Sequence, residues 1–443
     1  MTHPPSRPGA PPQPTLPQLL SRLVLGDAKE EDRGPRARHP VDWWIVLLVS
    51  SLTFFGLVMV FSASAIEAVE SSGSPTYYLV RQAVAAVIGL VGLVIFSRIP
   101  SHRLARVGWV LYFACLVGLV AVFIPGLGHK ANGAIRWIAF GSLRLQPSEF
   151  MKMALVLVLA ERVNRFPGGI SDLKRHVLPV LAITVPALVL VLAEPDFGTT
   201  VILAGIACMV LFLGGIPTRW MTTIAGICAV LAVLIILKDP YRLGRVSSWL
   251  DPWADASGGG YQVIMGWVAL HYGGLWGQGL GEAMSSMKWL PFAHTDFVAA
   301  VAGEELGFVR LAMLLGIYGV LIWRGVHVAN RSRTYFGTLA AGSITLILGL
   351  QTLFNLGVIM GLVPPKGLVL PFMSYGASAL IAHLWGVGVL LTVSAEPEEE
   401  AAPELAEGSG GGGRLVPVEG LLGGGLARWG QLARGWVARR GTS

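Results

Sequence analysis

The chain has 443 residues, of which 53% are hydrophobic and 13% are charged, and its formal net charge is +7. Its mean hydropathy is +0.64, and apolar runs of about 20 residues, the length that crosses a bilayer, recur along it. This composition excludes a string of soluble domains. The three cysteines lie in apolar runs without paired spacing, so we predict neither a disulfide framework nor a zinc site.

The first 42 residues are polar and rich in proline, with PPSRPGAPPQP near the start. A secretory signal would place a short basic stretch directly before an apolar one, and this segment does not. We therefore predict a flexible cytoplasmic tail over residues 1–42, a transmembrane domain over 43–394 and a second cytoplasmic tail over 395–443.

Apolar runs in the transmembrane domain predict an all-α, polytopic membrane protein with about ten transmembrane helices. The predicted spans lie near residues 43–62, 79–97, 107–124, 147–163, 177–193, 198–214, 219–238, 297–323, 336–361 and 373–394. Arginine and lysine gather in alternate short loops, so the positive-inside rule places both termini in the cytoplasm. The outward loops are then 63–78, 125–146, 239–296 and 362–372.

The predicted outer loop 239–296, between the seventh and eighth spans, is far longer than a connection requires. It holds five aromatic residues, Trp249, Trp253, Tyr261, Trp267 and Trp276. This composition favours a segment that lies on or dips into the membrane surface over a disordered one.

The C-terminal tail is acidic, then rich in glycine, and finally basic. In its last part, four apolar residues share one face of a helical wheel: Leu426, Trp429, Leu432 and Trp436. An amphipathic helix on the lipids of the inner leaflet and a disordered basic end both fit this pattern.

The stretch PFAHTDFVAAVAGEELGF places ionisable groups where the eighth span begins. Asp296 lies at the outer mouth of that span, beside His294 and Thr295. A carboxylate there is reachable from outside and partly desolvated, which favours a general base. Glu304 and Glu305 lie deeper, where both a buried structural network and a functional role remain open.

The stretch NGAIRWIAFGSLRLQPSEFMKMAL carries a second group of polar residues. Lys130, Arg136 and Arg144 precede the fourth span without a neighbouring acid, which suits an anionic partner such as a diphosphate. Glu149 and Lys152 are three residues apart on that span, so we predict a structural ion pair inside the bundle.

Two further stretches carry polar residues in outer loops. YRLGRVSSWLDPWADASGGGYQV includes Arg242, and VPPKGLVLPFMSYGAS has three prolines that prevent a continuous helix. Non-helical backbone at membrane depth is tolerated only against protein or a wet cavity, so we predict that Lys366, Ser374 and Tyr375 line a cavity open to the outside. No nucleotide-binding or zinc motif stands in a suitable context, so we expect no nucleic-acid partner and no dedicated metal site.

In five blocks, taken in order, the sequence resembles the SEDS family (shape, elongation, division and sporulation), the FtsW and RodA proteins of bacteria. The blocks are NGAIRWI…LQPSEFMKMAL, EPDFGTT, GGGYQVIMGWVALHYGGLWGQGLG, LPFAHTDFVAAVAGEELGF and PKGLVLPFMSYGAS. The resemblance spans roughly residues 43 to 394 and is nearest to the FtsW division branch. Phe292, Tyr272 and Ala377 depart from the family pattern, which usually has Glu, a small residue and Gly there.

The resemblance implies a peptidoglycan glycosyltransferase that polymerises lipid II at the outer face of the bacterial cytoplasmic membrane, at the division septum. Asp296 then falls on the catalytic Asp of the family, with inversion at the donor anomeric carbon. A divalent cation, Mg²⁺ or Mn²⁺, could help to neutralise the diphosphate. The implied partners are lipid II, a class B penicillin-binding protein and other division proteins. The candidate substrate-binding residues are Arg136, Trp137, Arg242, Tyr261, Gln262, His294, Thr295, Lys366, Ser374 and Tyr375.

Three alternatives remain at this point. A flippase for lipid-linked sugars would also need a polar cavity, but its polar path would have to reach both membrane faces. A scaffold for division proteins would explain the long tails, but it would not need Asp296. The elongation polymerase of the RodA type would share the chemistry and differ in its cellular role.

Overall fold

The computed structural model describes residues 40–131, 134–140, 143–165, 173–283 and 289–396. Most of the predicted N-terminal tail therefore lies outside the described residues, as do nearly all of the C-terminal tail and its four apolar positions, Leu426, Trp429, Leu432 and Trp436. The described residues form one compact unit.

A helix occupies each of the ten predicted spans. These helices are α2 (Trp43–Ser72), α3 (Tyr77–Arg98), α4 (Ser101–Ala121), α5 (Pro147–Asn164), α6 (Leu178–Ala193), α7 (Phe197–Leu213), α8 (Thr218–Lys238), α11 (Val298–Arg331), α12 (Tyr335–Ile359) and α13 (Ala377–Ser394). A π-helical turn, η1 (Leu173–Val177), leads into α6. The all-α membrane fold is thus confirmed.

Within the described part of the chain, eight helices are long and apolar enough to cross a bilayer. The other two of the predicted spans are α7, which has 17 residues, and α5, which carries four charged residues. The count of ten spans therefore stays a prediction. Nearly all of α5 is buried, and it packs against α4, α7, α12 and α13. Its charges are shielded by neighbouring helices, as expected for charge inside a membrane bundle.

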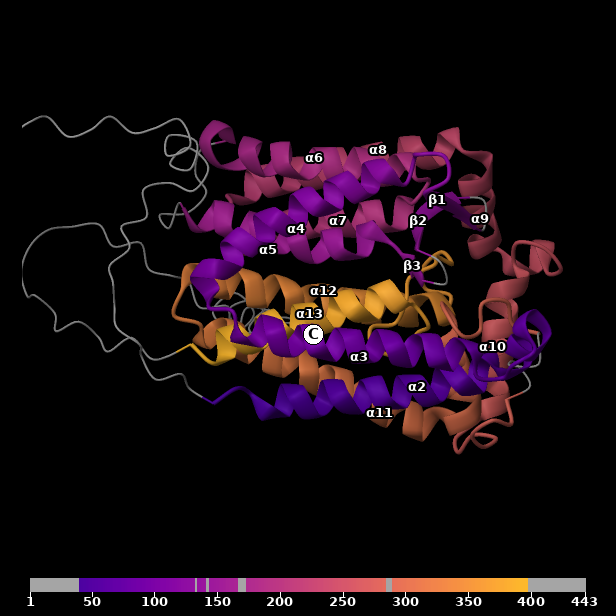
Figure 1. Cartoon of the computed structure of the whole chain (residues 1–443). Helices are drawn as coiled ribbons and strands as arrows, with labels where there is room; N and C mark the ends of the chain where they lie inside the picture. Colours follow the sequence, from indigo (N-terminus) through magenta and orange to yellow (C-terminus); the bar gives the residue numbers. More distant parts are fainter. Residues whose placement is uncertain (1–39, 132–133, 141–142, 166–172, 284–288, 397–443) are drawn as a thin grey trace, which may run out of the picture. The chain divides into compact units, whose positions relative to one another are not determined.

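Small residues allow α3 and α13 to pack closely. A Cβ on Gly92 would lie 1.8 Å from the indole nitrogen of Trp385, and one on Gly388 would lie 2.6 Å from the Leu93 carbonyl oxygen. Such contacts are typical of helix pairs in membranes, where close backbone approach drives association. Figure 1 shows α3 and α13 side by side, with α2 next to α3.

The predicted outer loop 125–146 contains a small antiparallel sheet in the order β1 (Gly128–Ala131), β2 (Ala134–Phe140) and β3 (Leu143–Leu145). The sequence signal for it is the Asn-Gly dipeptide at 132–133 between alternating residues, a strong hairpin indicator that an all-helical interpretation overlooks. In β2, Trp137 is paired with His129, and Ile138 with both Gly128 and Leu145.

The predicted loop 239–296 also has regular structure. It contains α9 (Pro240–Leu250), the 3₁₀ turn η2 (Pro252–Asp255) and α10 (Tyr261–Gly273). The indole of Trp249 donates to the carbonyl of Gly361 at 2.8 Å, which ties α9 to the segment after α12. The sheet, α9 and α10 lie at one end of the helices, and the start of α2 and the end of α13 lie at the other (Figure 1). This grouping is what the predicted sidedness requires.

The helix α11 is interrupted at Gly307, which has φ 77° and ψ 172°. A segment after α10 pairs with this break: Phe308 N–H donates to the Gly274 carbonyl at 2.9 Å, and Gln278 N–H to the Glu304 carbonyl at 3.0 Å. Glu304 and Glu305 are each 1% exposed, and the hydroxyl of Ser62 donates to the Glu305 carboxylate. These contacts favour the structural alternative for the two glutamates.

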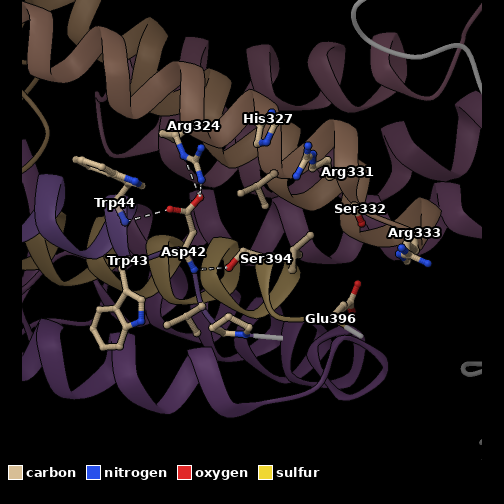
Figure 2. Close-up of a pocket in the computed structure, with 14 residues that line it drawn as sticks. Asp42, Trp43, Trp44, Arg324, His327, Arg331, Ser332, Arg333, Ser394 and Glu396 are labelled. Carbon is tan, nitrogen blue, oxygen red and sulfur yellow. Dashed lines mark hydrogen bonds and ion pairs between the residues drawn. The ribbon is translucent and has the colours of Figure 1, made fainter. Parts of the chain in front are cut away.

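At the opposite end of the bundle, which we predict to be cytoplasmic, a cavity of about 430 Å³ lies where α2 begins and where α11 and α13 end (Figure 2). Asp42 accepts a hydrogen bond from Trp44 N–H at 3.1 Å and another from Arg324 Nε at 3.0 Å. Its own N–H donates to the hydroxyl of Ser394 at 3.2 Å. One residue thus joins the ends of three helices that are far apart in sequence.

Candidate active site

Asp296 lies in the irregular segment just before α11, at the end of the bundle that carries the sheet. Its carbonyl oxygen accepts a hydrogen bond from the Asn355 side-chain amide at 2.9 Å. Its carboxylate faces Gly367, where an added Cβ would lie 3.1 Å from Asp296 Oδ2. The side chain is part-buried, so it remains open to a ligand while it is held between two segments.

The environment of Asp296 suits proton transfer near neutral pH. Burial raises the pKa of its carboxyl to about 7, and Arg245, His294 and Arg136 partly oppose that rise. A general base works best when its pKa lies near the working pH, because it is then both deprotonated and basic. The opposing influence of three cationic or ionisable side chains also indicates that they lie near the carboxylate.

His294 is buried on one side of Asp296 among aromatic rings. Its ring centroid lies 4.8 Å from that of Tyr78 and 5.5 Å from that of Tyr375. Its Nδ1 is 3.2 Å from a Glu67 carboxylate oxygen, and its carbonyl accepts from Tyr375 N–H at 2.9 Å. Glu67 of α2 therefore orients the imidazole, and Tyr375 joins the segment before α11 to the one before α13.

Arg136 projects from β2 onto the turn between α6 and α7. Its guanidinium donates to the carbonyls of Pro195 at 2.7 Å and Glu194 at 3.3 Å, and lies 3.7 Å from a carboxylate oxygen of Asp196. Asp196 in turn caps α7 by accepting from Thr199 N–H at 3.1 Å. The sheet and the turn thus hold Arg136 in a fixed position.

Two more cations meet on the ring of Phe197, the first residue of α7. The Lys366 ammonium lies 4.5 Å from the ring centroid, and the Arg242 guanidinium carbon lies 5.3 Å from it. Gly198 leaves room for this arrangement, because a Cβ there would lie 2.9 Å from Lys366 Cε. Burial lowers the pKa of Lys366 to about 8, opposed by the negative charge of Asp196.

Arg245, one turn after Arg242 on α9, extends the cationic group toward Asp296. Its Nη1 donates to the Pro365 carbonyl at 3.2 Å. Arg242 itself is held by Asp239 at 3.1 Å. The structure therefore brings together Arg136, Arg242, Arg245 and Lys366 around the first turn of α7, and the charges of Arg136 and Arg245 act on Asp296.

Glu194 is a second buried carboxyl at this site, with 0% exposure. Burial raises its pKa to about 8, with a further contribution from the charge of Asp196. It is therefore largely neutral at pH 7. Among the described residues, no group of three or more His, Cys, Asp or Glu side chains gathers to hold a metal ion.

The remaining candidate residues lie around this site in different ways. Trp137 follows Arg136 in β2, and the hydroxyl of Thr295 donates to the Phe292 carbonyl at 3.2 Å. Ser374 is buried, and its hydroxyl accepts from Leu370 N–H at 2.8 Å, so it also holds its own loop. Contact of these residues with a substrate stays a prediction.

Tyr261 and Gln262 begin α10, whose Gly266 packs on the ring of Phe297. No hydrogen bond between residues that the structure describes joins either side chain to Asp296 or Arg136. Of the cations predicted to accompany Arg136, Arg144 is exposed on β3, and the side chain of Lys130 is outside the described set.

Sequence reasoning missed several residues that shape the site: Glu67, Tyr78, Asn355 and Gly367. Arg245 was recognised as a polar residue of the YRLGRVSSWLDPWADASGGGYQV stretch but was not placed among the substrate-binding candidates, although it is three residues after Arg242 and so shares its helix face. Asn355 is an isolated amide in an apolar helix, which was also a signal. Nothing local distinguishes Gly367 or Tyr78.

The fold and the site together define a multi-pass membrane protein that places a part-buried carboxylate near a cluster of cations at one end of its helix bundle. Comparison with known proteins narrows this class. The cell cycle protein family of FtsW, RodA and SpoVE matches residues 42–399. The chain belongs to this family.

Individual relatives agree with that assignment. The chain is 37% identical over 353 residues to the "Probable peptidoglycan glycosyltransferase FtsW" of Geobacter metallireducens. The aligned region covers 80% of this chain and 94% of the relative. It is 35% identical over 353 residues to "Stage V sporulation protein E" of Bacillus subtilis, covering 80% of this chain and 96% of the relative.

Solved structures match as well. A chain from "Structural coordination of polymerization and crosslinking by a peptidoglycan synthase complex" superposes with a TM-score of 0.66 at 32% identity, covering 80% of this chain and 97% of that one. The rod shape determining protein RodA of Thermus thermophilus gives 0.59 at 30% identity, covering 80% of this chain and 96% of that one.

Proposed function

We propose that this chain is a peptidoglycan glycosyltransferase that polymerises lipid II into glycan strands at the outer face of the cytoplasmic membrane during cell division. The observation that carries the proposal is the part-buried Asp296 carboxylate, which lies against Gly367 and is influenced by the cations of Arg136 and Arg245. Relatives named FtsW peptidoglycan glycosyltransferases support the activity and the division branch.

The reaction needs a base and a diphosphate site, and the two parts of the site supply them. The Asp296 carboxylate takes the proton of the acceptor sugar 4-hydroxyl, and the oxygen of that hydroxyl forms the new bond to the donor anomeric carbon. The bond from that carbon to the diphosphate oxygen breaks with inversion, and undecaprenyl diphosphate leaves. Lys366, Arg136 and Arg242 stabilise the charge that develops on the leaving group.

We also propose that a divalent cation, Mg²⁺ or Mn²⁺, binds with the substrate and not in a protein cage. Mg²⁺ is usually held by one or two carboxylates together with substrate phosphates and water. Asp196 is the carboxylate nearest to Lys366 and Arg136, but its oxygens already bond Thr199 and face Arg136. Removal of the ion should therefore weaken lipid II turnover without lowering the thermal stability of the apo-protein, and a loss of that stability in chelator would contradict the proposal.

The direct test is polymerisation by the purified full-length protein in mild detergent with lipid II as the only substrate, with glycan strands resolved by length. The proposal expects polymer without added partner. Translocation of labelled lipid II across proteoliposomes, without polymer in either assay, would instead support the flippase alternative. The site favours the enzyme, because its base and cations lie at the same end of the bundle as the sheet.

The pH dependence of polymerisation follows from two pKa values. The rate should rise as the pH increases through about 7, because Asp296 accepts a proton only as a carboxylate. It should fall above about pH 8, where Lys366 loses its charge. Lys366→Arg, which keeps its charge, should shift the loss of rate to higher pH. Initial rates of polymerisation measured in matched buffers would show this shift. A rate that is unchanged from about pH 6 to 9 would contradict both assignments.

We infer that the partner is a class B penicillin-binding protein, the transpeptidase that crosslinks new strands, in the inner membrane at the septum with both termini cytoplasmic. The solved complex that coordinates polymerization and crosslinking supports this inference, as do the apolar helices. Co-purification from membranes in mild detergent and in nanodiscs should recover the pair. Failure in both would count against the partner but not against the polymerase activity.

A further inference from the structure

Asn355 lies near the end of α12 and is 1% exposed. Its side-chain amide nitrogen donates two hydrogen bonds, to the Asp296 carbonyl at 2.9 Å and to the Leu368 carbonyl at 2.7 Å. Both partners are irregular segments on either side of the candidate site. One buried amide therefore joins the segment before α11 to the segment after α12.

The orientation of this amide is set by chemistry. Both partners are carbonyl oxygens, which accept and cannot donate, so only the NH₂ group of Asn355 can face them. The side-chain carbonyl points the other way and has no hydrogen-bond partner among the residues that the structure describes. A carboxylate at this position would set three acceptors against one another. The site thus needs a two-proton donor of this size.

The bond to Leu368 also positions the neighbouring residues. Leu368 N–H donates to the Lys366 carbonyl at 2.8 Å, which closes a tight turn over Gly367. That turn presents Gly367 to the Asp296 carboxylate, where a Cβ added to Gly367 would lie 3.1 Å from Asp296 Oδ2. It also sends Lys366 to the ring of Phe197. The segments that carry Asp296 and Lys366 are therefore both held by the Asn355 amide.

We propose that Asn355 is a positioning residue, which holds the Asp296 carboxylate against Gly367 and fixes its distance from Lys366. The proposal rests on the proposed function, since it assigns Asp296 the role of base. It adds a requirement on α12 itself: the outer turn of this helix sets the catalytic geometry without touching the substrate.

Other contacts keep these segments docked when Asn355 is replaced. The Gln82 side chain donates to the Ser374 carbonyl at 3.0 Å and accepts from Gly376 N–H at 3.2 Å. Tyr375 N–H donates to the His294 carbonyl at 2.9 Å. Loss of the amide should therefore shift the carboxylate within a folded protein. A displacement of about 1 Å can cost on the order of 10²-fold in rate.

The test compares Asn355→Leu with Thr352→Val. Both replacements remove a buried polar group from the same helix at similar volume, but the Thr352 hydroxyl bonds only to its own helix, at the Leu348 carbonyl. Asn355→Leu should lower kcat for polymerisation about 10²-fold with little change in KM. When Asn355→Leu is added to the Asp296→Asn variant, it should lower kcat by less than about a further threefold, because the two residues act as a unit. Thr352→Val should stay within about threefold of wild type.

A second readout does not depend on activity. A hydrophobic carbodiimide labels protonated carboxyls, so the extent of Asp296 labelling against pH, measured by mass spectrometry, reports its titration. The midpoint should lie near pH 7 in the wild type and in Thr352→Val, and should fall by about one unit in Asn355→Leu as the carboxylate gains water. An unchanged midpoint in Asn355→Leu, or full additivity with Asp296→Asn, would overturn the proposal. A wild type that labels as expected but makes no polymer would overturn the proposed function alone.

Discussion

Asp296→Asn should leave a folded protein that makes almost no glycan polymer. The amide keeps the size of the carboxylate but cannot take a proton, and loss of a general base typically costs about 10²–10⁴-fold in rate. Because burial raises the pKa of Asp296, a neutral amide should also be tolerated well by the fold. Polymerisation rates together with thermal unfolding in detergent would separate the two effects.

Asp296→Glu and Asp251→Asn complete this test. The longer side chain restores a carboxylate but displaces it by about one methylene beside Gly367, which already lies close to Asp296 Oδ2, so it should recover little activity. Asp251 is an exposed carboxylate in the same outer region that caps η2 through Ala254 N–H at 3.3 Å, and its amide variant should polymerise normally. Near-normal polymerisation by Asp296→Asn would remove Asp296 as the base.

The long elements of the fold were predictable because each carries its own signal. Apolar runs of membrane length predicted α2, α3 and α12 to within a few residues at their starts, since a helix in lipid must satisfy its backbone internally. The break in α11 was not predictable in the same way. Gly307 reads as one glycine among apolar residues, and only the segment after α10, far away in sequence, explains its conformation.

The candidate site also combines features that have a local sequence signal with features that distant segments determine. Asp296 and Lys366 could be predicted because charge at the edge of an apolar run is costly without a function. Their relative placement could not, because Asn355, Gly367 and Phe197 set it, and these residues come from three different segments. Glu67 was equally hidden, since its role depends on where the imidazole of His294 lies. Local sequence therefore indicates which groups are candidates for the reaction, but not how they are held.

Removing one partner of the buried pair on α5 should cost more stability than breaking any other ion pair described here. The Lys152 ammonium lies 2.6 Å from a carboxylate oxygen of Glu149, and the two side chains are only 6% and 9% exposed. Removing one partner leaves the other charged in a dry environment, which typically lowers the free energy of unfolding by about 3–5 kcal/mol. Glu149→Gln and Lys152→Met should each lower folded yield and the unfolding temperature.

The double variant and a second pair on the same helix make the prediction specific. Glu149→Gln combined with Lys152→Met leaves no buried charge, so it should regain much of the stability that either single change loses. Arg165 and Glu161 are also 2.6 Å apart on α5, but their side chains are 25% and 14% exposed. Because water screens such a pair, Arg165→Gln should cost below about 1 kcal/mol. Wild-type unfolding temperatures for both single variants at the buried pair would show that its charges do not stabilise the bundle.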